Sequence, residues 1–205
     1  MVQLKAKPGI EQINIYQGGL AKLEGVKDVV KLSSNENPFG PSAFAIEAIR
    51  KMAFDLHLYP SADHSALRAA IAENFRLSAE NIICGVGSDE ILSFLCHAYA
   101  GPGDEVIHTE HGFALYRICV LAAGAIPIEV TEKERVTDVQ AIIDACTPRT
   151  KIIFIANPNN PTGTMVSLPE ITFIADHIPS HILLVLDGAY VDYIEGYDGG
   201  AKLVE

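Results

Sequence analysis

The feature that most constrains the fold is a regular alternation of two kinds of segment along the chain. Short runs rich in Ile, Val and Leu occupy residues 80–86, 104–109, 125–130, 150–156 and 181–187. Segments whose apolar residues recur with the helical period lie at 43–54, 64–75, 88–100, 113–123, 137–145 and 169–178. This alternation predicts an α/β fold, a three-layer sandwich in which helices cover both faces of a mostly parallel sheet.

Composition narrows the kinds of partner. The 205 residues are 49% hydrophobic, which is enough to bury a substantial core. Fifteen basic residues against 26 acidic ones give a net charge of −11, and the charges are scattered along the chain. Because this pattern makes no basic face, it argues against nucleic acid or an anionic membrane as a partner.

Cysteine usage and the N-terminal residues indicate the compartment. The cysteines are widely spaced in apolar surroundings and form no C-x-x-C motif; they are Cys84, Cys96, Cys119 and Cys146. We therefore expect reduced, structural thiols in a reducing compartment. The N-terminal residues contain no unbroken apolar stretch, and no segment approaches the ~20 apolar residues of a membrane span. The expected location is cytoplasmic.

The N-terminal residues differ from the rest of the chain. Residues 1–40 carry no strong periodicity, and we expect them to form an N-terminal arm. Residues 41–205 carry the alternating pattern and are expected to belong to one large domain. The pattern stops soon after the apolar run at 181–187, so we expect this domain to be incomplete.

A glycine-rich turn follows the first predicted strand, at the edge where open parallel sheets bind ligands. It reads GVGSDE at residues 85–90 and opens the predicted helix at 88–100. Free backbone N–H groups and the helix dipole make Gly87, Ser88 and Asp89 candidates for binding a phosphate. An ordinary helix cap without a ligand is the alternative, and Asp89 is well suited to it.

Three further strand ends carry candidate ligand-binding residues. Phe113 follows the strand at 104–109 and either stacks on a ligand or packs in the core. Asp187 ends an apolar run, where a carboxylate needs a helix cap or a cation as partner, and Tyr190 follows it. After the strand at 150–156 the sequence reads NPNNPTG, with more Asn and Pro than a turn requires. A ligand with a phosphate, a flat ring and a ring cation fits these positions, and pyridoxal 5′-phosphate has all three.

Five segments in family order resemble the fold-type I aminotransferases, and within them the histidinol-phosphate aminotransferase family. They are KLSSNENPFGPS (31–42), LYPSADHSALRAAIA (58–72), GVGSDEIL (85–92), ANPNNPTGT (156–164) and LDGAYVDY (186–193). The resemblance implies pyridoxal 5′-phosphate as cofactor, a homodimer, and a small domain that starts within residues 1–40. The implied reaction moves an amino group between histidinol phosphate and 2-oxoglutarate or glutamate in histidine biosynthesis.

The resemblance assigns the catalytic roles by position. Asp187 would pair with the pyridinium nitrogen and keep it protonated. Tyr190 and Asn160 would donate hydrogen bonds to the phenolic oxygen of the ring, on which Phe113 would stack. Prolines on either side of Asn160 would fix the backbone so that its amide points at the cofactor.

The remaining roles concern the phosphate and the substrate. Gly87, Ser88 and Asp89 would hold the phosphate, and Tyr59 would reach the phosphate of the cofactor in the partner subunit. Tyr16 and Asn37 would face the substrate.

One catalytic element of the family has no counterpart in the sequence. Relatives carry a lysine that bonds covalently to the cofactor, in a Ser-x-x-Lys or Ser-Lys context after a further strand. Lys202 is the only lysine beyond Asp187, and its surroundings, GGAKLVE, do not resemble that site. We therefore expect these residues to be the N-terminal part of a longer aminotransferase, inactive on its own and a weak binder of the cofactor.

Other functions fit the sequence less well. A nucleotide-binding G-x-G-x-x-G would need glycine where Glu90 stands. His108 and His111 lie three apart with no third ligand evident, whereas zinc pairs on helices are spaced by four. A non-catalytic interaction module is a further alternative. Within the family, aromatic amino acid aminotransferases and a phosphothreonine decarboxylase share the scaffold, so the substrate stays open.

Overall fold

The computed structural model describes residues 4–16, 18–20, 24–25, 27 and 29–204. The described residues divide into two compact units. One is formed within Asn14–Ser65, and the other within Met1–Ile13 together with Ala66–Glu205. The larger unit holds the sheet and the pocket described below, and the predicted division at residue 40 stays an expectation.

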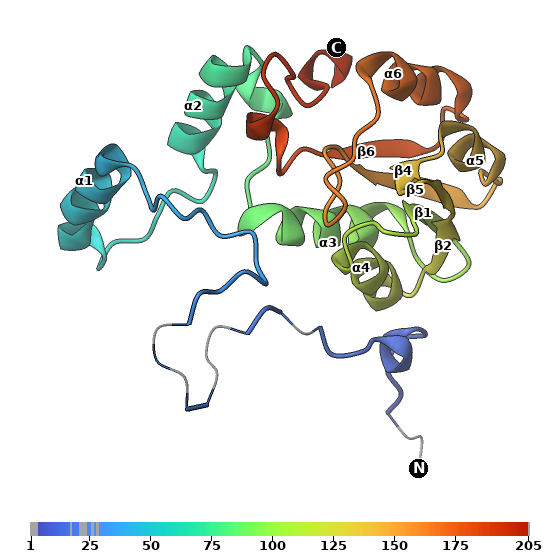
Figure 1. Cartoon of the computed structure of the whole chain (residues 1–205), viewed down its shortest axis with the longest axis horizontal. Coiled ribbons are helices and arrows are strands. Elements are labelled where there is room, and N and C mark those ends of the chain that lie inside the picture. Colours follow the sequence, from blue (N-terminus) through green and yellow to red (C-terminus); the bar gives the residue numbers. More distant parts are fainter. Residues whose placement is uncertain (1–3, 17, 21–23, 26, 28, 205) are drawn as a thin grey trace. The chain divides into compact units, whose positions relative to one another are not determined.

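The larger unit is built on a parallel sheet. Within the described residues this sheet has four strands in the order β2-β1-β5-β6, and every pair of neighbours is parallel (Figure 1). The strands are β1 (Glu105–Thr109), β2 (Ile126–Val130), β5 (Thr150–Ala156) and β6 (Leu183–Asp187). They match four of the predicted apolar runs, and the α/β fold is confirmed.

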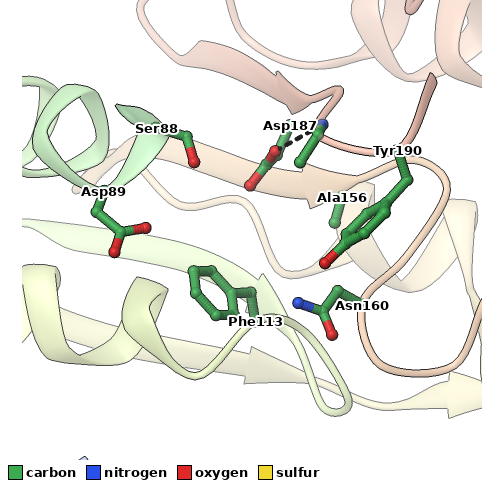
Figure 2. A pocket seen from close by; sticks show the side chains of 8 residues that line it. Ser88, Asp89, Phe113, Ala156, Asn160, Asp187 and Tyr190 are labelled. Atoms are coloured by element: carbon green, nitrogen blue, oxygen red, sulfur yellow. Dashed lines mark hydrogen bonds between the residues drawn. The ribbon is translucent and has the colours of Figure 1, made fainter. Parts of the chain in front are cut away.

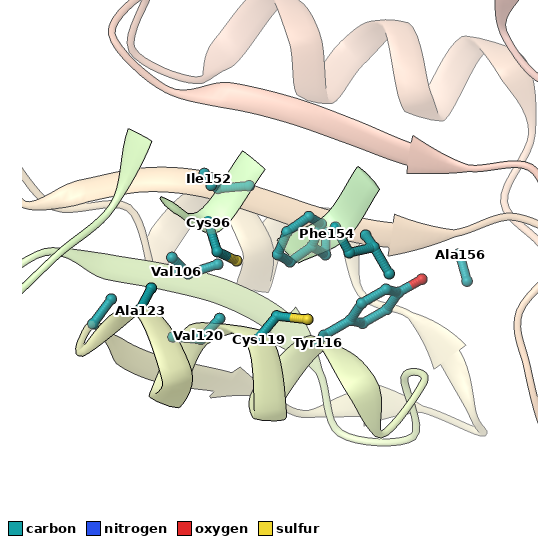
Figure 3. Close-up of a cluster of buried hydrophobic side chains, with 11 residues drawn as sticks. Cys96, Val106, Tyr116, Cys119, Val120, Ala123, Ile152, Phe154 and Ala156 are labelled. Atoms are coloured by element: carbon teal, nitrogen blue, oxygen red, sulfur yellow. The ribbon is translucent and has the colours of Figure 1, made fainter. Parts of the chain in front are cut away.

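Helices cover both faces of this sheet (Figure 1). On one face, α3 (Gly87–Tyr99) and α4 (Leu115–Ala123) pack on a core that includes Ile152 and Phe154 (Figure 3). On the other face, α5 (Val139–Asp144) and α6 (Leu168–His177) pack on Ile153 and Ile155. Because side chains alternate along β5, its apolar run contributes to both cores, as the sequence predicts for a doubly covered strand.

The prediction of a strand at residues 80–86 is wrong. The segment begins in the 3₁₀ helix η3 (Ala79–Asn81) and continues as irregular backbone, with Ile83 78% and Val86 85% exposed. A strand needs a neighbour to satisfy its N–H and C=O groups, and no strand in the described part of the chain pairs with this segment. The Val86 N–H instead donates to Glu90 Oε2 at 2.7 Å, just before α3 begins.

The remaining elements are short or lie outside the sheet. The helices predicted at 43–54 and 64–75 form as α1 (Ala43–Met52), followed by η2 (Ala53–Asp55), and α2 (Ser65–Phe75). Three further 3₁₀ helices are η1 (Ile10–Gln12), η4 (Val191–Tyr193) and η5 (Ala201–Val204). No helix of the described residues has the length and apolar character needed to cross a membrane.

A small antiparallel hairpin, β3 (Glu132–Lys133) with β4 (Val136–Thr137), was not predicted from the sequence. Its two turn residues, Glu134 and Arg135, both adopt positive φ, at 53° and 65°. Turns of this kind favour Asn and Gly, so the charged pair gives no hairpin signal.

Glu105 links the start of β1 to the segment before β5. Its side chain is buried and accepts hydrogen bonds from the Thr147 hydroxyl at 2.5 Å and from the Arg149 guanidinium. The Thr147 hydroxyl, and then Arg149, hold the pKa of this carboxyl below its ordinary value. A carboxyl whose pKa falls on folding stabilises the fold above its unfolded pKa, and this contribution is lost as the pH drops through the folded pKa.

Replacing Glu105 by Gln should therefore change the acid dependence of stability. At pH 7 we expect the variant to be less stable by about 1 kcal/mol, because the exposed Arg149 side chain leaves the pair screened by water. The difference between the two proteins should shrink as the pH falls below the unfolded pKa of the carboxyl and through its lowered folded pKa. Urea unfolding from pH 3 to 7 measures it, and a difference that stays constant over that range would contradict the assignment.

Candidate active site

A small pocket, open in part to solvent, lies at the carboxyl edge of the sheet (Figure 2). It is lined by Ser88, Asp89, Phe113, Ala156, Asn160, Asp187, Ala189 and Tyr190. These residues come from the start of α3, the loop after β1, the end of β5 with its following loop, and the end of β6 with its following turn. The pocket therefore lies where parallel sheets bind ligands.

Most of the residues predicted from the sequence meet in this pocket. Six of the described lining residues are among them: Ser88, Asp89, Phe113, Asn160, Asp187 and Tyr190. Gly87 does not line the pocket, but it opens α3 directly before Ser88 with φ +76°, a value that favours glycine. Their roles toward a cofactor stay predictions.

The Asp187 carboxylate is oriented by two donors. Its Oδ1 accepts the Ala189 N–H at 3.1 Å, and its Oδ2 accepts the hydroxyl of Tyr116 at 2.9 Å (the first is dashed in Figure 2). Its backbone carbonyl accepts the Asn157 N–H at 3.0 Å, which continues the β5–β6 pairing. The carboxylate is thus fixed at the end of β6 before any ligand binds.

Tyr116 is a hydrogen-bond partner of Asp187 that could not be predicted from the sequence. It lies in the first turn of α4, its ring is 1% exposed, and burial together with the nearby Asp187 raises the pKa of its phenol. In the sequence it occupies an apolar position of a helical pattern, 71 residues away from Asp187, so no local signal connects the two.

The three asparagines of NPNNPTG make different contacts. Asn157 is 1% exposed and closes the loop, because its amide bonds both the N–H and the C=O of Val166 at 3.0 Å and also donates to the Tyr197 hydroxyl at 2.8 Å. Asn159 donates to the His111 carbonyl at 3.1 Å and to the Thr162 hydroxyl at 2.8 Å. Of the three, Asn160 reaches the pocket.

The prolines and the glycine of this loop have special backbone conformations. The peptide bonds Asn157–Pro158 and Asn160–Pro161 are both cis, and Gly163 has φ +69°. The Gly163 N–H donates to the Asn159 carbonyl at 2.9 Å, so the turn closes on itself. Asn157 and Asn159 also brace this loop through their hydrogen bonds to Val166 and Thr162, and the role predicted for the prolines beside Asn160 stays a prediction.

The start of α3 forms another part of the pocket wall. The first-turn N–H groups of a helix have no acceptor within the helix, and the dipole makes this end positive. Ser88 and Asp89 bring this end to the pocket wall. The acidic side chains of Asp89 and Glu90 reduce the positive potential, although Glu90 is engaged by the Val86 N–H.

Three predicted residues belong to the smaller compact unit. Tyr16 is 57% exposed and Tyr59 is fully exposed. Asn37 is exposed, and its Oδ1 accepts the Phe39 N–H at 2.9 Å. Their roles toward the substrate and a partner subunit stay predictions.

The two histidines considered as metal ligands have separate partners. The buried His108 contacts the Thr109 carbonyl through Nδ1 at 3.0 Å, whereas His111 Nδ1 contacts Glu132 Oε2 at 2.9 Å. Within the described residues, no group of three or more His, Cys, Asp or Glu side chains is arranged to hold a metal ion.

Comparison with known proteins shows the family of this chain. The chain belongs to the aminotransferase class I and II family, whose model matches residues 27–202. A histidinol-phosphate aminotransferase from Ruegeria sp. (strain TM1040) is 62% identical over 204 residues, and one from Dinoroseobacter shibae is 60% identical over 205. Each alignment covers 100% of this chain but only 56% and 57% of the relative, so the chain spans little more than half their length.

Solved structures of the same family have the same fold. A histidinol-phosphate aminotransferase from Sinorhizobium meliloti, in complex with pyridoxal 5′-phosphate, superposes with a TM-score of 0.75 at 28% identity, covering 78% of this chain and 44% of that one. A mutant aspartate aminotransferase from Thermus thermophilus gives a TM-score of 0.69 at 30% identity, covering 75% and 46%.

Proposed function

We propose that the complete protein is a pyridoxal-phosphate-dependent aminotransferase that exchanges an amino group between histidinol phosphate and 2-oxoglutarate or glutamate. The observation that carries the proposal is the meeting of Asp187, Asn160 and the start of α3 around one pocket. Identity of about 60% to histidinol-phosphate aminotransferases over the whole chain supports the choice of substrate.

The residues present fit this cofactor group by group. The pocket offers a carboxylate for a protonated ring nitrogen, an aromatic side chain for the ring face, and an amide and a phenol for the ring oxygen. The start of α3 offers N–H groups for the phosphate. Asp187 is held by two donors, so it meets a ligand already oriented.

When bound, pyridoxal 5′-phosphate supplies an electron-withdrawing ring that stabilises negative charge on the carbon bearing the amino group. Asp187 would keep the proton on the ring nitrogen, because a carboxylate favours the charged form of its partner. Asn160 and Tyr190 would donate to the ring oxygen, and Phe113 would cover one face of the ring and exclude water.

Covalent attachment of the cofactor needs a lysine, and we propose that these 205 residues do not supply it. No lysine is among the described residues that line the pocket, and Lys202 is exposed in η5. Mixing the chain with pyridoxal 5′-phosphate and reducing with borohydride should therefore leave Lys202 without stoichiometric label. Mass spectrometry after proteolysis reads the result, and one cofactor per chain on Lys202 would contradict the proposal.

The proposal extends to the oligomeric state and the cellular location of the protein. A homodimer is proposed because Tyr59 is fully exposed, as a residue that reaches a partner's cofactor must be. A cytoplasmic location is proposed because free cysteines such as Cys84 and Cys146, which are partly accessible, persist in reducing compartments.

The substrate is tested with the complete gene product. With 2-oxoglutarate as acceptor, kcat/KM should be higher for histidinol phosphate than for phenylalanine, by about a hundredfold if the substrate phosphate is bound by charged donors. A preference for phenylalanine would instead favour the aromatic amino acid aminotransferases, the second candidate.

A further inference from the structure

Tyr116 touches both the carboxylate and the aromatic side of the pocket without lining it. Its ring stacks on Phe154, with centroids 5.1 Å apart and planes at 15°, and meets Phe113 edge-on at 5.9 Å. Its hydroxyl donates to Asp187 Oδ2 at 2.9 Å. Figure 3 shows this hydroxyl pointing out of the apolar cluster, toward Ala156 at the end of β5, which lines the pocket.

We propose that Tyr116 is a positioning residue for the cofactor, which holds the Asp187 carboxylate toward the ring nitrogen and supports Phe113 beside the ring. The inference rests on the proposed function, since it assumes that pyridoxal 5′-phosphate occupies the pocket. It adds a residue from α4 to a site whose lining comes from other segments (Figure 2).

The geometry explains why two donors are needed. A carboxylate with one fixed oxygen can still rotate about its last bond, and the Ala189 N–H fixes only Oδ1. The Tyr116 hydroxyl fixes Oδ2 and thereby sets the plane of the group. Each oxygen keeps a further lone pair, so the carboxylate can still accept a hydrogen bond from a ring N–H.

In this hydrogen bond Tyr116 is the donor and Asp187 Oδ2 is the acceptor. Burial of the phenol, and then the charge of Asp187, raise the pKa of Tyr116, so it keeps its proton where exposed tyrosines lose theirs. Tyr116 therefore still donates its hydroxyl proton to Asp187 Oδ2 at a pH where exposed tyrosines have lost theirs. Phenylalanine would fill the same space against Phe154 and Phe113 but would leave Oδ2 without this donor.

The test compares two ligands on the 205-residue chain. One is pyridoxal 5′-phosphate, and the other is its 1-deaza analogue, in which a C–H replaces the ring nitrogen. Tyr116→Phe should weaken binding of the cofactor by about tenfold and that of the analogue by about twofold at most, because the analogue has no N–H for Asp187. Tyr99→Phe, at an exposed position in the last turn of α3, is the matched control and should change neither dissociation constant.

Each outcome decides the matter. Equal weakening for both ligands, or none for either, would overturn the inference, since Tyr116 would then act through packing alone or not at all. If the unaltered chain bound the cofactor no better than the analogue, the proposed function and this inference would both fail. Should Tyr116→Phe not fold, 3-fluorotyrosine at position 116 changes the acidity of the hydroxyl with little change in shape, and it must alter the affinity for the cofactor but not for the analogue.

Discussion

Replacing Asp187 by Asn should weaken the binding of pyridoxal 5′-phosphate by about a hundredfold, equivalent to about 3 kcal/mol. The carboxylate lies at the end of β6, held by Ala189 and Tyr116, with its charge available to the pocket. An asparagine has nearly the same shape but carries no charge, so a protonated ring nitrogen loses its counter-ion. Fluorescence titration of the chain with the cofactor measures the change without requiring turnover.

Asp192→Asn provides the matched control for this variant. Asp192 is exposed in η4, five positions along the chain from Asp187, and its replacement removes the same charge from the same region. The control should bind the cofactor as the unaltered chain does. If both variants lost the same affinity, the effect would come from net charge, and the role given to Asp187 would be wrong.

The second large effect concerns stability rather than binding. Asn157→Ala should lower the free energy of unfolding by about 3 kcal/mol, because it removes the amide that pairs with the N–H and C=O of Val166. Val166 is 3% exposed, so water cannot replace those bonds in the folded chain. The Tyr197 hydroxyl also loses its donor. Urea unfolding followed by circular dichroism measures the difference.

Asn160→Ala is the natural comparison, because it changes the same residue type in the same loop. Its amide faces the pocket, so we expect a loss of cofactor affinity with a change in unfolding free energy of about 0.5 kcal/mol or less. Equal destabilisation by the two variants would contradict the division of tasks among the asparagines.

The spacing of apolar residues along the chain made much of the fold predictable from the sequence. The strands β1, β2, β5 and β6 coincide with apolar runs, and the helices that cover them follow the helical period. The prediction of a strand at 80–86 was wrong because an apolar composition alone does not provide a neighbouring strand. Whether a segment pairs as a strand depends on its place in the whole sheet. The β3–β4 hairpin was missed because Glu134 and Arg135 are unusual residues for its turn.

The same limit applies to the candidate site. Residues next to a predicted strand could be identified from the sequence, whereas contacts between distant segments could not. Residues at strand ends, such as Phe113 and Asp187, were predictable because the edge of a parallel sheet gathers them. The partnership of Tyr116 with Asp187 was not, since it joins segments 71 residues apart. Asn157 and Asn159 were recognised as part of a motif, but their separate hydrogen bonds with Val166 and His111 depend on how the loop folds back.

A crystal structure of the chain soaked with pyridoxal 5′-phosphate tests the central idea most directly. We expect one cofactor per chain, its pyridine nitrogen facing Asp187, its ring oxygen facing Asn160, and its phosphate beside Ser88 at the start of α3. Density for the cofactor at another place, or in this pocket with the phosphate turned toward Asp187, would show that these side chains gather for some other reason.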